Sequence, residues 1–221
     1  DLNGSALGRA YQPNPFDHSS GDITLDNSPS PLTEDQYIQT GEDAYLTLIH
    51  EVGHAVGLDH PHDGAFVEVA SPGKSNQNTV MSYFSYSATD RPGGYTDTDG
   101  AKMGYSPQTW MIDDIAALQY MYGTNELTNR TDDVYDIGNL SNSSISDGII
   151  YQTIWDAAGN DTISWAGQTT DSSINLNPGT HSFFGKISSI ADTDFNNGND
   201  NLGIGDGILG IAHGADIENA I

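Results

Sequence analysis

The segment from His50 to His60 holds residues whose types and spacing could bind a metal ion and use it. His50 and His54 are four residues apart, so on a helix both imidazoles project from one face and can reach a single ion. Glu51 follows His50 and is turned about 100° around the helix. It could therefore accept a proton from a metal-bound water without becoming a ligand. Gly57 permits a sharp turn through which His60 could return to the metal.

Three neutral imidazoles leave a fourth position for water, which is typical of a catalytic zinc site rather than a structural one. A lone histidine is usually an ordinary core or surface residue, and an isolated H-E-x-x-H can arise by chance. Here the longer pattern H-E-x-x-H-x-x-G-x-x-H lies on a predicted helix, and its glycine falls where that helix should end. We therefore interpret His50, His54 and His60 as zinc ligands and Glu51 as the general base.

A predicted helix would position the first two histidines. Apolar residues recur at helical spacing from Leu46 to Val56, and the pattern stops at Gly57. Thr40 and Asp43 resemble a capping box at its start. A second amphipathic helix is expected from about Ser106 to Tyr122.

The remaining patterns predict β-structure. Alternating runs over residues 6–11 and 22–26 indicate two strands. After Thr124, short apolar runs such as those at 148–151, 162–165 and 173–176 are separated by Asn, Asp and Gly, which indicates an all-β region. The natural domain boundary lies near residues 123–130.

The charge balance limits the kinds of partner that the protein could bind. The 221 residues include 31 Asp and Glu but only 6 Lys and Arg, a net charge of −25. Phosphate binding needs clustered cations, so nucleic acid is excluded as a partner and an anionic membrane surface is disfavoured. No apolar run of ~18 residues predicts a transmembrane helix. Bound calcium would relieve the self-repulsion, although a merely soluble, salt-adapted surface would have the same composition.

The chain has no cysteine, which excludes disulfides and thiolate catalysis. A zinc ion must then take histidine, carboxylate or phenolate ligands. Together with the acidity and the abundance of Asp, Gly and Asn, this composition suits a secreted, extracellular bacterial protein.

The zinc motif is the signature of the metzincin metallopeptidases, which also have a methionine turn downstream. Thr79-Val80-Met81-Ser82-Tyr83 resembles that turn, and Pro61 after the third histidine and Met-Ser-Tyr at the turn resemble the serralysins. The resemblance continues through residues 112–119, 155–162 and 217–221. It implies that Met81 lies beneath the zinc histidines and that Tyr83 is a further zinc ligand in the resting enzyme.

The resemblance also implies a fold and further sites. The expected α+β fold has a truncated zincin lobe at residues 1–127, with the active-site helix and Met-turn. A β-rich calcium-binding domain at 128–221 follows, the start of a β-sandwich or β-roll. Relative to the serralysins, the first part of the catalytic domain and the nonapeptide calcium repeats are missing. Two site assignments follow: peptide substrates would contact Gly8, Arg9 and Ala10, and calcium ligands would come from Arg130, Asp132, Asp133, Asp156, Ala158, Gly159 and Asp161.

The function expected from these residues is a secreted, zinc-dependent and calcium-stabilised endopeptidase. Glu51 would deprotonate a zinc-bound water that attacks the peptide carbonyl, and Tyr83 would then donate a hydrogen bond to the oxyanion. Protein or peptide substrates and a proteinaceous inhibitor are the expected partners. Two alternatives remain: an inactive zinc- and calcium-binding module, and a half-enzyme or fragment of a nicked protease. The presence of Glu51 argues against the inactive module.

Overall fold

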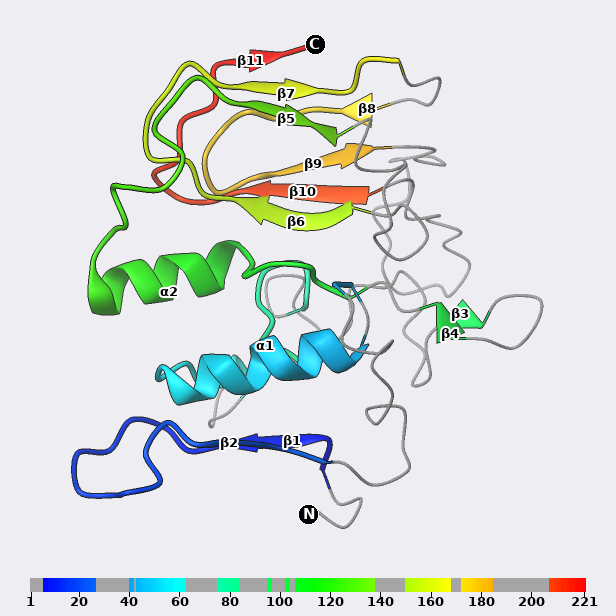
Figure 1. Cartoon of the computed structure of the whole chain (residues 1–221). Coiled ribbons are helices and arrows are strands. Elements are labelled where there is room, and N and C mark those ends of the chain that lie inside the picture. Colours follow the sequence, from blue (N-terminus) through cyan, green and yellow to red (C-terminus); the bar gives the residue numbers. More distant parts are fainter. Residues whose placement is uncertain are drawn as a thin grey trace.

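The computed structural model describes residues 6–26, 40–41, 43–62, 75–83, 95–96, 102–103, 106–137, 150–167, 172–184 and 207–221. Figure 1 shows these residues as a stack: a β-hairpin, then two helices, then a body of strands. Helix α1 carries His50, Glu51 and His54, and the β-rich body lies on the side of α2 away from α1. The described residues therefore form the α+β fold that the sequence predicts.

The hairpin consists of β1 (Gly8–Ala10) and β2 (Ile23–Leu25), which pair antiparallel with Arg9 opposite Thr24. This confirms the two strands expected over residues 6–11 and 22–26. Leu7 accepts a hydrogen bond from the backbone N–H of Asp26, and Tyr11 donates one to Asp22. Because hydrogen-bonded pairs alternate in an antiparallel ladder, Arg9 directs its backbone groups toward β2, and Gly8 and Ala10 direct theirs away from it.

Helix α1 (Asp43–Ala55) packs on this hairpin and carries the first two histidines. The helix predicted from about Thr40 to Gly57 is therefore present. Thr40 and Gly41 lie in a turn before the helix, and Asp43, the other residue of the expected cap, is the first residue of α1. Gly57 ends the helical region with φ of +100°, the left-handed conformation expected for it.

Helix α2 (Ile112–Tyr122) is shorter than the sequence predicts. The prediction of helix from Ser106 is wrong, because residues 106–111 form neither helix nor strand and contact the β-rich body. Pro107 disfavours helical conformation at Ser106, and the backbone N–H of Gln108 bonds to the Tyr151 carbonyl at 2.8 Å. The Thr109 hydroxyl accepts the N–H of Thr153 at 2.8 Å. These contacts cover an edge strand that would otherwise stay open.

The β-rich body has two sheets with the strand orders β6-β10-β9-β8 and β11-β7-β5. Strands β6 and β10 are parallel, as are the neighbours β5, β7 and β11, whereas β9 runs antiparallel to both β10 and β8. Figure 1 shows the sheets as two layers. The strands are β5 (Val134–Asp136), β6 (Ile150–Ile154), β7 (Thr162–Ser164), β8 (Ser172–Ser173), β9 (His181–Phe184), β10 (Gly207–Ile211) and β11 (Asn219–Ala220). A separate two-stranded ribbon pairs β3 (Tyr95–Thr96) with β4 (Lys102–Met103).

Two hydrophobic clusters stabilise this arrangement. One lies between the sheets and includes Ile163, Phe184 and Leu209, all fully buried. The other joins the helical part to the β-rich body, because Val80, Met81 and Met111 pack with residues of β6 and β10. No helix among the described residues has both the length and the apolar character needed to span a bilayer.

Candidate metal centre

The structure brings the three predicted zinc ligands together. The Nε2 atom of His60 lies 3.1 Å from that of His50 and 3.0 Å from that of His54. Nitrogens bound 2.0–2.1 Å from a tetrahedral zinc ion are roughly 3.3 Å apart, so this spacing fits such an ion. Three neutral rings that direct their lone pairs at one point repel one another unless a cation lies between them. The donor set therefore fits zinc.

The other ring nitrogens of His50 and His54 are held by backbone carbonyls. Nδ1 of His50 lies 2.8 Å from the Val80 carbonyl oxygen, and Nδ1 of His54 lies 2.8 Å from that of Leu58. A carbonyl can only accept, so each Nδ1 carries the proton and each Nε2 presents a lone pair to the shared point. Burial, opposed by the Val80 bond, lowers the pKa of His50 to about 4, which keeps its ring neutral.

Glu51 lies beside the histidines and contacts the hairpin. Its side chain is buried, and burial raises the pKa of its carboxyl group. A carboxylate with a raised pKa is a stronger base, as a proton acceptor requires. The backbone N–H of Ala10 donates a hydrogen bond to this carboxylate. Gly8 leaves the space it needs: a Cβ at Gly8 would lie 2.6 Å from Cγ and 2.7 Å from Oε1 of Glu51.

Met81 lies under the helix that carries the histidines. It is part of a turn at Val80–Met81 and is almost fully buried. Its sulfur lies directly below Gly53, where a Cβ would come closer to it than 3.0 Å. Gly53 thus allows the turn to approach α1 between the two helical histidines.

Tyr83 lies at the open side of the histidines. Its ring centroid is 5.5 Å from that of His50 and 4.5 Å from that of His60, and 68% of the residue is exposed. His62, which our sequence analysis did not select, stacks on His60 at 4.9 Å and lies 4.7 Å from Tyr83. Only its place two residues after a predicted ligand could have indicated it.

A second cluster of metal-ligating groups lies at one end of the β-rich body. Carboxylate oxygens of Asp133, Asp156 and Asp161 lie within 4.8 Å of one another. Asp161 is fully buried, and its Oδ2 has no hydrogen-bond partner. Burial and the neighbouring carboxylates raise the pKa of Asp161. An unpartnered buried carboxylate oxygen among other carboxylates fits a calcium ligand.

The other predicted calcium residues surround this cluster. A Cβ at Gly159 would lie 2.7 Å from Oδ2 of Asp161 and closer still to the Thr131 carbonyl, so the loop packs tightly there. Ala158 donates its N–H to Asp156 at 3.1 Å. Asp132 accepts the N–H of Asn160 at 3.0 Å, and both Asp132 and Arg130 are exposed.

Two residues near this cluster were missed. Glu218 accepts the backbone N–H of Asp161 at 2.7 Å, and the Tyr135 hydroxyl donates to Asp156 at 2.5 Å. Burial and the Asp156 carboxylate raise the pKa of Tyr135, which keeps its hydroxyl protonated as a donor. Glu218 is 57 residues from Asp161 in the chain, so no local spacing could have indicated it.

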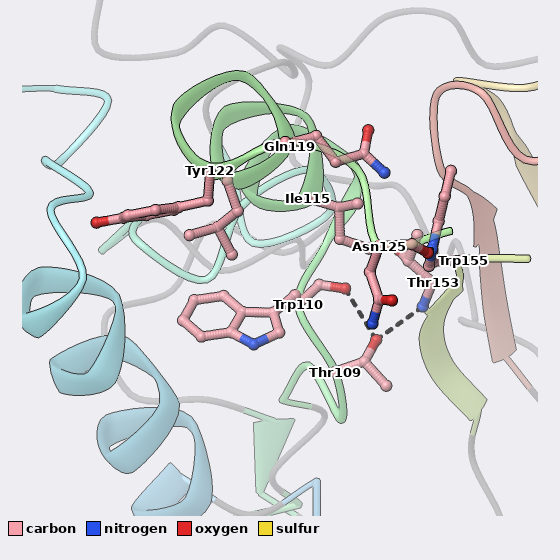
Figure 2. Close-up of a pocket in the computed structure, with 10 residues that line it drawn as sticks. Thr109, Trp110, Ile115, Gln119, Tyr122, Asn125, Thr153 and Trp155 are labelled. Carbon is pink, nitrogen blue, oxygen red and sulfur yellow. Dashed lines mark hydrogen bonds between the residues drawn. The ribbon is translucent and has the colours of Figure 1, made fainter. Parts of the chain in front are cut away.

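A pocket among the described residues lies away from both clusters. It lies between α2 and the β-rich body, with a volume of about 420 Å³. Figure 2 shows Trp110, Tyr122 and Trp155 around it. None of the predicted site residues lines it.

Comparisons with known proteins support the motif-based interpretation. A family model described as matrixin matches residues 1–80. The chain is 33% identical over 210 residues to serralysin C of Dickeya chrysanthemi, an alignment that covers 89% of this chain and 37% of that protein. It is also 33% identical over 200 residues to the serralysin of Proteus mirabilis, which covers 83% of this chain and 38% of that protein.

A third relative is the metallopeptidase AprA of Pseudomonas marginalis, 34% identical over 154 residues, or 64% of this chain and 31% of that protein. The chain thus spans about a third to two fifths of the length of these relatives. The matches extend over most of the chain at about one third identity. They confirm the resemblance that the zinc motif and the methionine turn indicated.

Proposed function

We propose that this serralysin-type metzincin chain provides the zinc-binding and peptide-cleaving centre of a secreted endopeptidase. The observation that carries the proposal is the convergence of three Nε2 atoms beside a buried carboxylate. Carbonyl partners hold two of the rings in the tautomer that a metal requires. The metzincin resemblance implies zinc rather than another divalent ion.

When bound, zinc would supply a Lewis acid that polarises the peptide carbonyl and lowers the pKa of water. His50, His54 and His60 would hold it. Glu51 would accept a proton from the attacking water and deliver it to the leaving amine nitrogen. The raised pKa of Glu51 favours its acceptance of this proton, and the hydrogen bond from the Ala10 N–H holds the carboxylate in place.

We assign the hydrogen bond to the developing oxyanion to Tyr83. Its ring borders His50 and His60 and is largely exposed, so its hydroxyl can reach a substrate placed against the metal. In the resting enzyme the same hydroxyl would be a further zinc ligand, as the resemblance implies. Met81, buried under Gly53, would act as the residue of the Met-turn.

The substrate would bind as an extended peptide along β1. Gly8 and Ala10 direct their backbone groups away from β2, toward the side where such a strand could pair. Because the Ala10 N–H bonds to Glu51, the Ala10 carbonyl would make the substrate contact. Arg9 directs its backbone groups into the hairpin, so a substrate contact there would use its exposed side chain. The net charge of −25 makes a nucleic acid or an anionic membrane an unsuitable partner. A proteinaceous inhibitor would occupy the same edge as the substrate.

The calcium site would stabilise the β-rich region. Asp133, Asp156 and Asp161 would contribute carboxylates, and the carbonyls around Arg130, Ala158 and Gly159 would complete the shell. Asp132 would orient this loop through the N–H of Asn160. In this proposal residues 1–127 form the catalytic lobe and residues 128–221 the calcium-binding domain.

The test compares Glu51→Gln with the parent protein. We expect the variant to bind zinc with similar affinity and to lose most casein hydrolysis, since only the proton acceptor changes. Asp59→Asn serves as the matched control, because Asp59 is a neighbouring carboxylate that bonds to Gln12 rather than to the histidines. The assay is run with chelator and then with zinc restored. A Glu51→Gln variant as fast as the parent would refute the mechanism.

The same assay separates the enzyme from an inactive zinc- and calcium-binding module. Both would bind the metals, but only the enzyme would lose casein hydrolysis on chelation and recover it with zinc. A parent protein that binds zinc without cleaving any protein substrate would leave the inactive module or the half-enzyme as the better interpretation.

A further inference from the structure

Asp114 connects α2 to the turn beneath the histidines. It lies in the first turn of α2, and only 2% of it is exposed. Its Oδ2 accepts the backbone N–H groups of Val80 at 2.8 Å and Met111 at 2.9 Å. Its Oδ1 accepts the hydroxyl of Thr79 at 2.7 Å. One carboxylate thus fixes the start of α2 and two consecutive residues, Thr79 and Val80, where the chain enters the turn.

The Thr79 hydroxyl extends this contact to the peptide group between Val80 and Met81. Thr79 Oγ1 accepts the N–H of Met81 at 3.0 Å. The carbonyl at the other end of the same peptide group belongs to Val80, and it is the partner of His50 Nδ1 at 2.8 Å. Three hydrogen bonds therefore lead from the carboxylate to the histidine ring: His50 to the peptide, the peptide to Thr79, and Thr79 to Asp114.

His54 provides an internal comparison. Its Nδ1 partner is the Leu58 carbonyl, which lies at the end of its own helix and is 2.8 Å away. The N–H of Leu58 bonds to the Gly53 carbonyl of the same helix. The orientation of His54 therefore depends on α1, whereas that of His50 depends on a turn that α2 holds.

We propose that Asp114 is a positioning residue for His50, acting through Thr79 and the Val80–Met81 peptide group. The proposal rests on the proposed zinc site, because it concerns the orientation of one of its ligands. The Asp114 carboxylate accepts the Thr79 hydroxyl at the end of this series of hydrogen bonds. It thereby fixes the plane of the Val80–Met81 peptide group and the direction of the Val80 carbonyl. Hydrogen bonds in such a chain also polarise one another, which increases electron density at Nε2 of His50.

A purely structural role for Asp114 would have a different signature. Its bond to the Met111 N–H stabilises the start of α2, and losing only that bond would weaken the whole fold without favouring one histidine. The neighbouring Asp113 provides the matched control. It is also in the first turn of α2, but it is exposed and its backbone N–H bonds to the Asn78 carbonyl.

The experiment measures ring Nδ1–H exchange by NMR in zinc-loaded protein labelled with ¹⁵N-histidine. Zinc affinity is measured separately by competition with a chromophoric chelator. For Asp114→Ala we expect faster exchange at His50 and parent-like exchange at His54. The zinc dissociation constant should rise about tenfold, the lower end of the range for outer-shell partners of a metal ligand. Asp113→Ala should match the parent in both measurements.

The result that overturns the proposal is a parent-like His50 signal and zinc affinity in Asp114→Ala, or an equal change at both histidines. If Asp114→Ala does not fold, Thr79→Val interrupts the same chain at its middle. Faster exchange confined to His50 then supports the proposal, and an unchanged His50 overturns it. A parent protein that binds no zinc would instead refute the proposed function, so the two failures are distinguishable.

Discussion

The contact between Gly53 and Met81 leads to a prediction about the packing beneath the proposed zinc site. Gly53 lies inside α1, where alanine would normally be preferred by about 1 kcal/mol. Its backbone is not in the left-handed region, so the helix itself would accept alanine. The added Cβ, however, would lie closer than 3.0 Å to the Met81 sulfur, 3.2 Å from Met81 Cε and 3.3 Å from Trp110.

The magnitude follows from two opposing effects. Overpacking a well-filled core costs about 1–3 kcal/mol, and Met81 is 1% exposed, with little room to move aside. The gain in helix propensity offsets about 1 kcal/mol of this cost. We therefore expect Gly53→Ala to lower the free energy of unfolding by about 1 kcal/mol, and to weaken zinc binding because the turn beneath His50 is displaced.

A double-mutant cycle with Met81→Ala tests this reasoning. Met81→Ala alone should cost about 2–5 kcal/mol through the cavity it leaves. In that background the Gly53 substitution has no sulfur to collide with, so it should become stabilising. Urea denaturation in excess zinc measures all four variants. If Gly53→Ala is as stable as the parent, or if its effect has the same sign in both backgrounds, the packing argument is wrong.

Three further predictions concern other sites. Calcium should raise the melting temperature of the parent relative to chelator-treated protein, and Gly159→Ala should abolish this rise, because its Cβ would displace Asp161. Calorimetry of both proteins with and without calcium measures this. Tyr83→Phe should lower kcat more than it raises KM in casein hydrolysis, since the hydroxyl is assigned to the oxyanion rather than to substrate binding. Burial raises the pKa of Asp114 to about 6. Between pH 4 and 6 the folded state therefore binds more protons at this group than the unfolded state does, and stability falls as pH rises. Relative to Asp114→Asn, the parent should lose up to about 3 kcal/mol of unfolding free energy over this range, as urea titrations at each pH would show.

The parts of the site that sequence could predict are local in the chain. The i, i+4 spacing of His50 and His54 and the turn at Gly57 depend only on helix geometry and on glycine's access to positive φ. The approach of His60 follows from these two features. The hairpin strands are likewise visible as alternating residues between turn formers. For these elements, short-range spacing was enough.

The parts that could not be predicted depend on distant segments. Residues 106–111 have a helical pattern, but Gln108 and Thr109 bond to β6, and this pairing outweighs the local preference. The reason for a glycine at position 8 is the Glu51 side chain, 43 positions later in the sequence. Asp114 reads as an ordinary acidic residue at a helix start, and only the fold brings it to Thr79 and Val80.

The packing of the β-rich body against the turn beneath the three histidines leads to a last prediction. Val80 and Met81 are buried in a cluster completed by Tyr151 of β6 and Ile208 of β10. Ending the chain at residue 127, the proposed domain boundary, would remove these two side chains and expose the apolar surface beneath the three histidines.

We therefore expect the 1–127 segment to bind zinc at least tenfold more weakly than residues 1–221, because the turn that orients His50 loses its packing. Adding back a separate 128–221 segment should restore part of the affinity if the cluster can re-form. Zinc titration of the segment alone, of the mixture and of the intact chain would decide. Equal affinity in all three would show that the histidines and α1 are sufficient, and that the β-rich body contributes nothing to the site.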